Sequence, residues 1–165
     1  MTIDSLKRLL VFVLFYLAQA LVCNRIQLFH CAIPLPYIHF VIMFPRNLPK
    51  WSILLWSFAL GVTIDMFSNT PGVASSSLTL AGALQPYLLE FFIPRDAEEN
   101  INVSAKTLGW GKFSTFTLLI VFIFCFTFFT VEAFNFYNWQ QWLQYIFSSM
   151  LLTFILILSL ETIRQ

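Results

Sequence analysis

Long stretches of apolar residues, separated by short polar connections, run through the whole chain. The stretch Leu118–Val131 is continuous and lacks the strict apolar/polar alternation that the strands of a membrane barrel show. Because hydrocarbon cannot hydrogen-bond to the backbone, such apolar runs must cross the bilayer as helices. The pattern therefore predicts an all-α integral membrane protein with a single membrane domain over residues 1–165.

The apolar runs predict a bundle of six membrane-spanning helices, at residues 6–22, 33–44, 51–67, 73–93, 113–134 and 139–160. The second run is the shortest and contains Pro34 and Pro36, so it starts earlier, tilts, or is a broken segment inside the bundle. Pro86 in the fourth run predicts a kink rather than an end, because apolar residues continue to Ile93. Residues 94–112 are predicted to form the one long loop.

Lysine and arginine are spread unevenly over the predicted connections. If the N-terminus is cytoplasmic, only Arg25 of the nine basic residues lies outside. The basic residues on the inner side are Lys7, Arg8, Arg46, Lys50, Arg95, Lys106, Lys112 and Arg164. The positive-inside rule then predicts that both termini and the 94–112 loop are cytoplasmic. A cleavable signal peptide is the alternative for the first run, but apolar residues continue through Val22, which favours a retained span.

Composition narrows the class of protein further. Of the 165 residues, 59% are hydrophobic and only 10% are charged, against about 25% charged residues in an ordinary soluble domain. These values exclude a small soluble globular domain and an intrinsically disordered chain. The net charge of +1 also argues against a nucleic-acid partner, which needs a strongly basic surface.

Four small or polar residues mark the third apolar run and the turn after it: Ser57, Gly61, Asp65 and Asn69. Because they are four positions apart, they are predicted to share one helix face, on which the small residues allow a neighbouring helix to approach closely. An ionised group costs about 3 kcal/mol at the centre of a span, so Asp65 is expected to face the bundle or a partner. Three roles for Asp65 stay open: a cap on the turn amides, a contact with a partner, or a proton relay.

Few other polar groups are predicted inside the bundle. Glu132 lies near the outer end of the fifth span, at a depth from which it could approach Asp65. His39 is expected to be a hydrogen-bonded core group rather than a ligand. The polar stretch at residues 75–79 predicts a helix start that packs on the Asp65 face, with a small-molecule pocket as the alternative.

The sequence shows no arrangement that predicts an enzyme. No His, Cys, Asp or Glu residues have metal-ligand spacing, and neither a nucleophile arrangement nor a phosphate-binding loop is present. We therefore expect no catalytic residue, no metal and no cofactor. Cys23 and Cys31 flank the first outer connection, where a disulfide or two buried free thiols are both open.

One stretch of the sequence matches a known pattern. Residues 61–72 follow the pattern G-x-x-x-D-x-F-S-x-T-P-G, which is formed by Gly61, Asp65, Phe67, Ser68, Thr70, Pro71 and Gly72. With the short six-span layout and the basic inner loops, the chain resembles the family of the rod shape-determining protein MreD over essentially its whole length. The segments Asn24–Phe29, Pro94–Asp96 and Leu108–Trp110 resemble the Bacteroidetes branch of that family.

The resemblance implies a noncatalytic scaffold in the bacterial cytoplasmic (inner) membrane. Such proteins bind an MreC-like protein in the cell-elongation (rod) complex, which also contains the MreB cytoskeleton, a RodA-type glycosyltransferase and a class B transpeptidase. The complex directs lateral peptidoglycan synthesis and cell shape. The implied fold is similar to the substrate-binding subunit of energy-coupling-factor transporters. Gly61, Asp65, Pro71 and Gly72 are the motif residues, and Asp65 is expected to matter most.

Two other readings come from different classes of protein. The first is the substrate-binding subunit of a vitamin-type transporter, which often docks through an A-x-x-x-A pattern in the first span. Here Ala18 and Ala20 lie only two positions apart, so the pattern is missing. The second is a membrane assembly protein of an unrelated pathway. The face that binds the partner and the formation of a homodimer are left open by the sequence.

Overall fold

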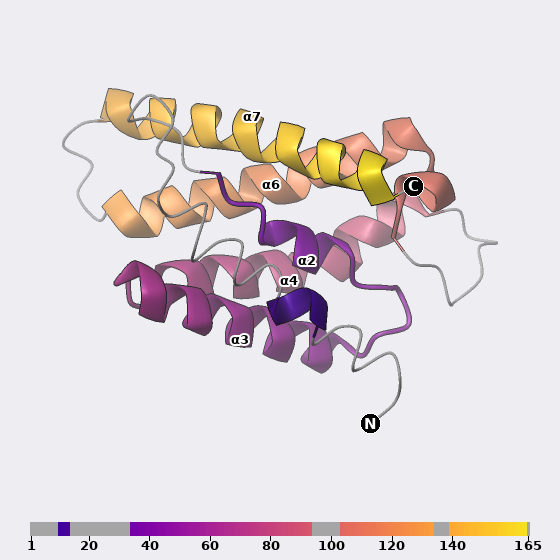
Figure 1. The fold of residues 1–165 in the computed structure, drawn as a ribbon, viewed down its shortest axis with the longest axis horizontal. Helices are drawn as coiled ribbons and strands as arrows, with labels where there is room; N and C mark the ends of the chain where they lie inside the picture. The colour runs from indigo at the N-terminus through magenta and orange to yellow at the C-terminus, as the bar shows by residue number, and fades with distance from the viewer. Residues whose placement is uncertain (1–9, 14–33, 94–102, 134–138, 165) are drawn as a thin grey trace.

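The computed structural model describes residues 10–13, 34–93, 103–133 and 139–164, and within these ranges every regular element is a helix. Its helices are α2 (Ile38–Ile42), α3 (Lys50–Ser68), α4 (Val73–Phe92), α5 (Ala105–Leu108), α6 (Trp110–Ala133) and α7 (Trp139–Arg164). The long helices lie side by side: α3 packs on α4, α4 on α6, and α6 on α7 (Figure 1). The short helix α2 contacts both α4 and α6.

Three of these helices, α3, α6 and α7, are long and apolar enough to cross a membrane. The predicted all-α class is therefore confirmed for the described part of the chain, and the three helices fit a membrane protein. Helix α4 is long as well, but it contains the polar residues Ser75–Ser77, Gln85 and Glu90 and is not among these three. The count of six spans and the orientation in the membrane stay predictions.

The predicted boundaries agree with the long helices to within a few residues. The ranges 51–67 and 73–93 correspond to α3 and α4, and α4 passes through Pro86 without ending. The range 113–134 corresponds to α6, and the range 139–160 to α7, which extends to Arg164. Of the first predicted span, only residues 10–13 belong to the described part of the chain.

The predicted 94–112 loop contains more regular structure than expected. Helix α6 already begins at Trp110, and α5 precedes it. The hydroxyl group of Ser104 accepts a hydrogen bond from the backbone N–H of Thr107, while the Thr107 hydroxyl group accepts one from the backbone N–H of Ser104. This reciprocal capping box stabilises one helical turn in a segment whose polar residues indicated only a loop.

The second predicted span, 33–44, is not one continuous helix. Only the five residues of α2 are helical, and the segment around them is irregular yet buried from Pro34 to Ile42. Pro34 and Pro36 explain this, since a proline lacks the N–H group and disfavours a helical residue before it. Of the three alternatives for this run, the structure therefore has the broken segment inside the bundle.

Side chains from the neighbouring helices satisfy the backbone of this broken segment. The backbone N–H of Leu35 donates to Oγ1 of Thr153 in α7 at 3.2 Å. At the other end, Nε2 of Gln85 in α4 donates to the carbonyl of Phe44 at 3.1 Å. Irregular backbone is tolerated at membrane depth only when it is buried in protein with its polar groups satisfied.

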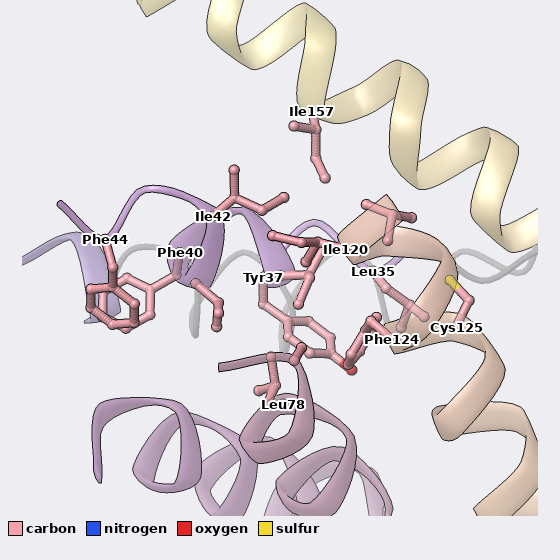
Figure 2. Packing of buried hydrophobic residues seen from close by; sticks show 14 of the residues in the cluster. Leu35, Tyr37, Phe40, Ile42, Phe44, Leu78, Ile120, Phe124, Cys125 and Ile157 are labelled. Carbon is pink, nitrogen blue, oxygen red and sulfur yellow. The ribbon is translucent and has the colours of Figure 1, made fainter. Parts of the chain in front are cut away.

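Aromatic and aliphatic side chains of the broken segment fill the space between the long helices (Figure 2). The ring of Tyr37 is fully buried and meets Phe124 of α6 edge to face, with ring centroids 5.5 Å apart. Leu78 of α4 and Ile157 of α7 are also fully buried in the same cluster. The broken segment is thus the centre of the core rather than a helix at its edge.

Candidate functional site

The carboxylate of Asp65 lies at the corner between α3 and α4, where it binds the start of α4. Its Oδ1 accepts from the backbone N–H of Ala74 at 2.8 Å, and its Oδ2 accepts from those of Ser75 at 2.9 Å and Gly72 at 3.1 Å. These amides have no partner inside α4 itself, because the first turn of a helix lacks preceding carbonyl groups. Asp65 is therefore an N-terminal cap supplied by a different helix.

Charge and burial strengthen this contact. Only 5% of the surface of Asp65 is exposed, and a charge-assisted hydrogen bond is roughly twice as strong as a neutral one. The positive end of the α4 dipole also favours a carboxylate at this place. The hydroxyl group of Thr70 lies 3.5 Å from Oδ1 and adds a weaker contact from the turn. The cap that was one of three open roles for Asp65 is thus present in the structure.

The turn between the two helices needs two residues with left-handed backbone. Asn69 ends α3 with φ of 55°, and its N–H donates to the carbonyl of Asp65. Gly72 precedes α4 with φ of 92°, a conformation that residues with a side chain rarely adopt. Pro71 lies between them and is exposed. The motif residues Pro71 and Gly72 therefore shape the turn, and Gly72 also donates to Asp65.

The small residues of the motif bring α3 and α4 together. A Cβ atom on Gly61 would overlap the Cα atom of Ser75 and lie 2.9 Å from the carbonyl oxygen of Ala74. The next contact along the interface joins Ser57, one turn before Gly61 on α3, to Gly82, two turns after Ser75 on α4. A Cβ atom on Gly82 would overlap the hydroxyl group of Ser57. Ser57 satisfies its own hydroxyl group by donating to the carbonyl of Ile53 at 2.7 Å. The close approach predicted from Ser57 and Gly61 is therefore present.

The predicted common face holds for three of its four residues. Ser57, Gly61 and Asp65 are all buried against α4. Asn69 is different, because α3 ends at Ser68 and the left-handed backbone of Asn69 turns it out of the helical pattern, where it is exposed. Its role is to end the helix rather than to extend the face.

The other two predicted polar residues take no part in the hydrogen bonds of this corner among the described residues. Glu132 is exposed near the end of α6, and no hydrogen bond joins it to Asp65 in the part of the chain that the structure describes. His39 is 3% exposed, and its Nε2 lies 4.0 Å from Oε2 of Glu161 in α7. The structure thus places a carboxylate that was not predicted beside His39.

Glu161 is the polar residue that sequence reasoning missed. It is 1% exposed, and its Oε1 accepts from the backbone N–H of Ala105 at 3.0 Å. The sequence offered one signal for it, because Ser149, Thr153 and Glu161 fall on a four-residue spacing together with Ile157. In the structure all four are buried. This spacing on α7 is the same as the spacing of Ser57, Gly61 and Asp65 on α3.

Many polar side chains of the described residues bond to the start of another helix, to the broken segment or to a carbonyl group of their own helix. No group of three or more His, Cys, Asp or Glu side chains comes together there as a metal site would need. Cys125 is a buried thiol, whereas Cys23 and Cys31 lie outside the described residues. The best-defined polar constellation is therefore the set of hydrogen bonds around Asp65.

Comparison of the chain with protein-family models, with curated proteins and with solved structures finds no match.

Proposed function

We propose that the chain is a noncatalytic, multi-pass component of the bacterial cytoplasmic membrane that binds an MreC-like protein in the cell-elongation complex. In this role it scaffolds or regulates the peptidoglycan synthesis that sets cell shape. The observation that carries the proposal is the corner formed by residues 61–72. The motif residues Gly61, Asp65 and Gly72 all take part in holding the end of α3 against the start of α4.

The corner would hold a surface for the partner in a fixed position. Met66 and Phe67 directly follow the buried Asp65, yet they are 77% and 64% exposed. Since Asp65 fixes the end of α3, it also fixes the direction in which these two apolar side chains point. In the proposed topology this corner lies at the outer face of the membrane, next to the place where a single-span partner would leave the bilayer.

Aromatic residues at the helix ends support this placement in a membrane. Trp51, Trp110 and Trp139 are exposed and lie at the starts of α3, α6 and α7. Exposed tryptophan is typical of the membrane–water interface. At the inner end, Lys50 lies over the ring of Tyr87 at 4.1 Å from its centroid, a cation–π contact that joins α3 to α4.

Co-purification from native membranes tests the proposal. The tagged chain is solubilised in mild detergent, and the captured proteins are identified by mass spectrometry. We expect an MreC-like protein in the parent sample and a reduced amount of it with Asp65→Leu. Glu90→Gln is the matched control, because Glu90 is an exposed carboxylate on the same helix pair. Recovery of an ATPase module without an MreC-like protein would support the vitamin-type transporter instead and overturn the proposal.

A further inference from the structure

The contacts between the long helices bring several helix ends together. The rings of Phe92 and Phe116 lie 5.9 Å apart, so the end of α4 lies beside the start of α6. The rings of Phe126 and Trp142 lie 5.6 Å apart, so the end of α6 lies beside the start of α7. With the corner between α3 and α4, these contacts bring the starts of α3 and α6 and the ends of α4 and α7 to one end of the bundle (Figure 1).

This end, here called the basic end, carries all the described lysine and arginine residues: Arg46, Lys50, Lys106, Lys112 and Arg164. Asp65 and Glu132, by contrast, lie near the other ends of α3 and α6. Glu90 is the exposed carboxylate of the described residues at the basic end, since Glu161 is buried there. The basic end therefore has an excess of positive charge at the surface where it would meet lipid headgroups.

Arg46 and Lys50 are the two cations that flank the start of α3. The backbone N–H of Leu48 donates to the carbonyl of Pro45 at 3.3 Å, which closes a turn around Arg46. Lys50 is the first residue of α3, four positions later. Both side chains are exposed, and neither forms an ion pair with a carboxylate in the described ranges. Both charges are thus available to a ligand at the surface.

An exposed apolar stripe of α4 begins beside Lys50. The ammonium group of Lys50 lies 4.1 Å from the centroid of the Tyr87 ring. From Tyr87, exposed side chains continue away from the basic end at helical spacing through Leu84 and Leu80. In a membrane such a helix face contacts acyl chains, and tyrosine is typical of the level of the headgroups. Two positive charges therefore lie next to an apolar stripe, which is the pattern that complements an anionic phospholipid.

We propose that Arg46 and Lys50 bind the headgroup of a phospholipid with a net negative charge, whose acyl chain lies along Tyr87, Leu84 and Leu80. An arginine guanidinium binds phosphate oxygens through two parallel hydrogen bonds, and a lysine ammonium adds a point charge. A zwitterionic phospholipid offers the same phosphate, but its own ammonium group cancels the charge and makes it the weaker ligand. This lipid site needs only a membrane around the helices and is independent of the MreC-like partner.

Native mass spectrometry of the full chain in detergent tests this lipid site. The purified protein is titrated with dioleoylphosphatidylglycerol and, in parallel, with dioleoylphosphatidylcholine, which has the same acyl chains and no net charge. We expect the protein to bind the phosphatidylglycerol more tightly. Arg46→Gln and Lys50→Gln should each weaken its binding about fivefold, as expected for the loss of one cation at a lipid surface, and leave the binding of phosphatidylcholine at the parent level.

Lys112→Gln is the matched control, because Lys112 is exposed at the start of α6 and the substitution removes the same charge from the basic end. It should bind phosphatidylglycerol like the parent. Equal weakening in Lys112→Gln would overturn the site, since the charge of the whole end would then attract the lipid. Parent-like binding in both Arg46→Gln and Lys50→Gln would overturn it as well. An excess of inorganic phosphate at constant ionic strength should leave the lipid bound, and full displacement would show that a free phosphate is the ligand instead.

Discussion

Gly61 of α3 and Ser75 of α4 are in backbone contact, so close that a Cβ atom on Gly61 would overlap the Cα atom of Ser75. The backbone cannot move aside as a flexible side chain can, and the two helices would have to separate. The same contact lies directly beside the amide of Ser75, which donates to Asp65. Helix separation at this point would therefore also disturb the cap.

Gly61→Ala is expected to destabilise the protein by about 2 kcal/mol or more, in the range known for overpacked interiors. Thermal unfolding of the purified protein in detergent measures the effect. Gly111→Ala is the matched control, since a Cβ atom there meets nothing within 4 Å and alanine favours a helix. Equal midpoints of unfolding for the parent and Gly61→Ala would contradict the close contact.

Gly82 faces a side chain across the same interface, whereas Gly61 faces the backbone of α4. A Cβ atom on Gly82 would overlap the hydroxyl oxygen of Ser57. We expect Gly82→Ala to destabilise the fold, and Ser57→Ala to restore part of the loss by removing that oxygen. A double-mutant cycle should give a coupling energy of about 1 kcal/mol. Simple additivity of the two changes would show that these residues do not meet.

The cap predicts an order among substitutions of Asp65. Asp65→Asn keeps one acceptor oxygen and should cost about 2 kcal/mol, whereas Asp65→Leu leaves three backbone amides without their acceptor and should cost more. Unfolding midpoints in detergent measure the order. Under the proposed function, rod growth of cells that carry only the variant should fail in the same order. Parent-like growth with both variants would mean that Asp65 is dispensable there.

Thr153 is expected to matter more for stability than its position in an apolar helix indicates. Thr153→Val keeps the shape of the side chain but removes the acceptor for the buried N–H of Leu35. An unsatisfied buried donor costs about 1–3 kcal/mol. Thr162→Val, an exposed change of the same kind, should cost far less. Similar losses in thermal stability for the two variants would contradict the role of Thr153.

Helix positions and the Asp65 corner could be predicted because both depend on local sequence. Continuous apolar runs located α3, α6 and α7, and the four-residue spacing placed Ser57, Gly61 and Asp65 on one face. Asn69 was placed on that face as well, since spacing alone does not indicate where left-handed backbone ends a helix. The capping box at Ser104 and Thr107 is also local, and it could have been found.

The broken segment and the Glu161 contact depend on residues that are distant in the sequence. Pro34 and Pro36 showed that a helix was difficult there, but not that Thr153 and Gln85 would bind the two ends of the segment. In the same way, nothing near His39 in the sequence indicates Glu161 as its neighbour. The four-residue spacing of Ser149, Thr153 and Glu161 on α7 could have placed Glu161 on an inward-facing side of the helix. Its partners, however, follow only from the packing of the helices.

The hydrogen bond from Leu35 to Thr153 joins residues that are 118 positions apart. During synthesis, the amide of Leu35 emerges long before its acceptor exists, and Gln85 becomes available well before Thr153. The broken segment can therefore reach its final place only after α7 has been made and inserted. The last helix of the described chain thus supplies a hydrogen-bond acceptor to one of its earliest segments. A chain truncated before α7 would lack this acceptor at the centre of its core.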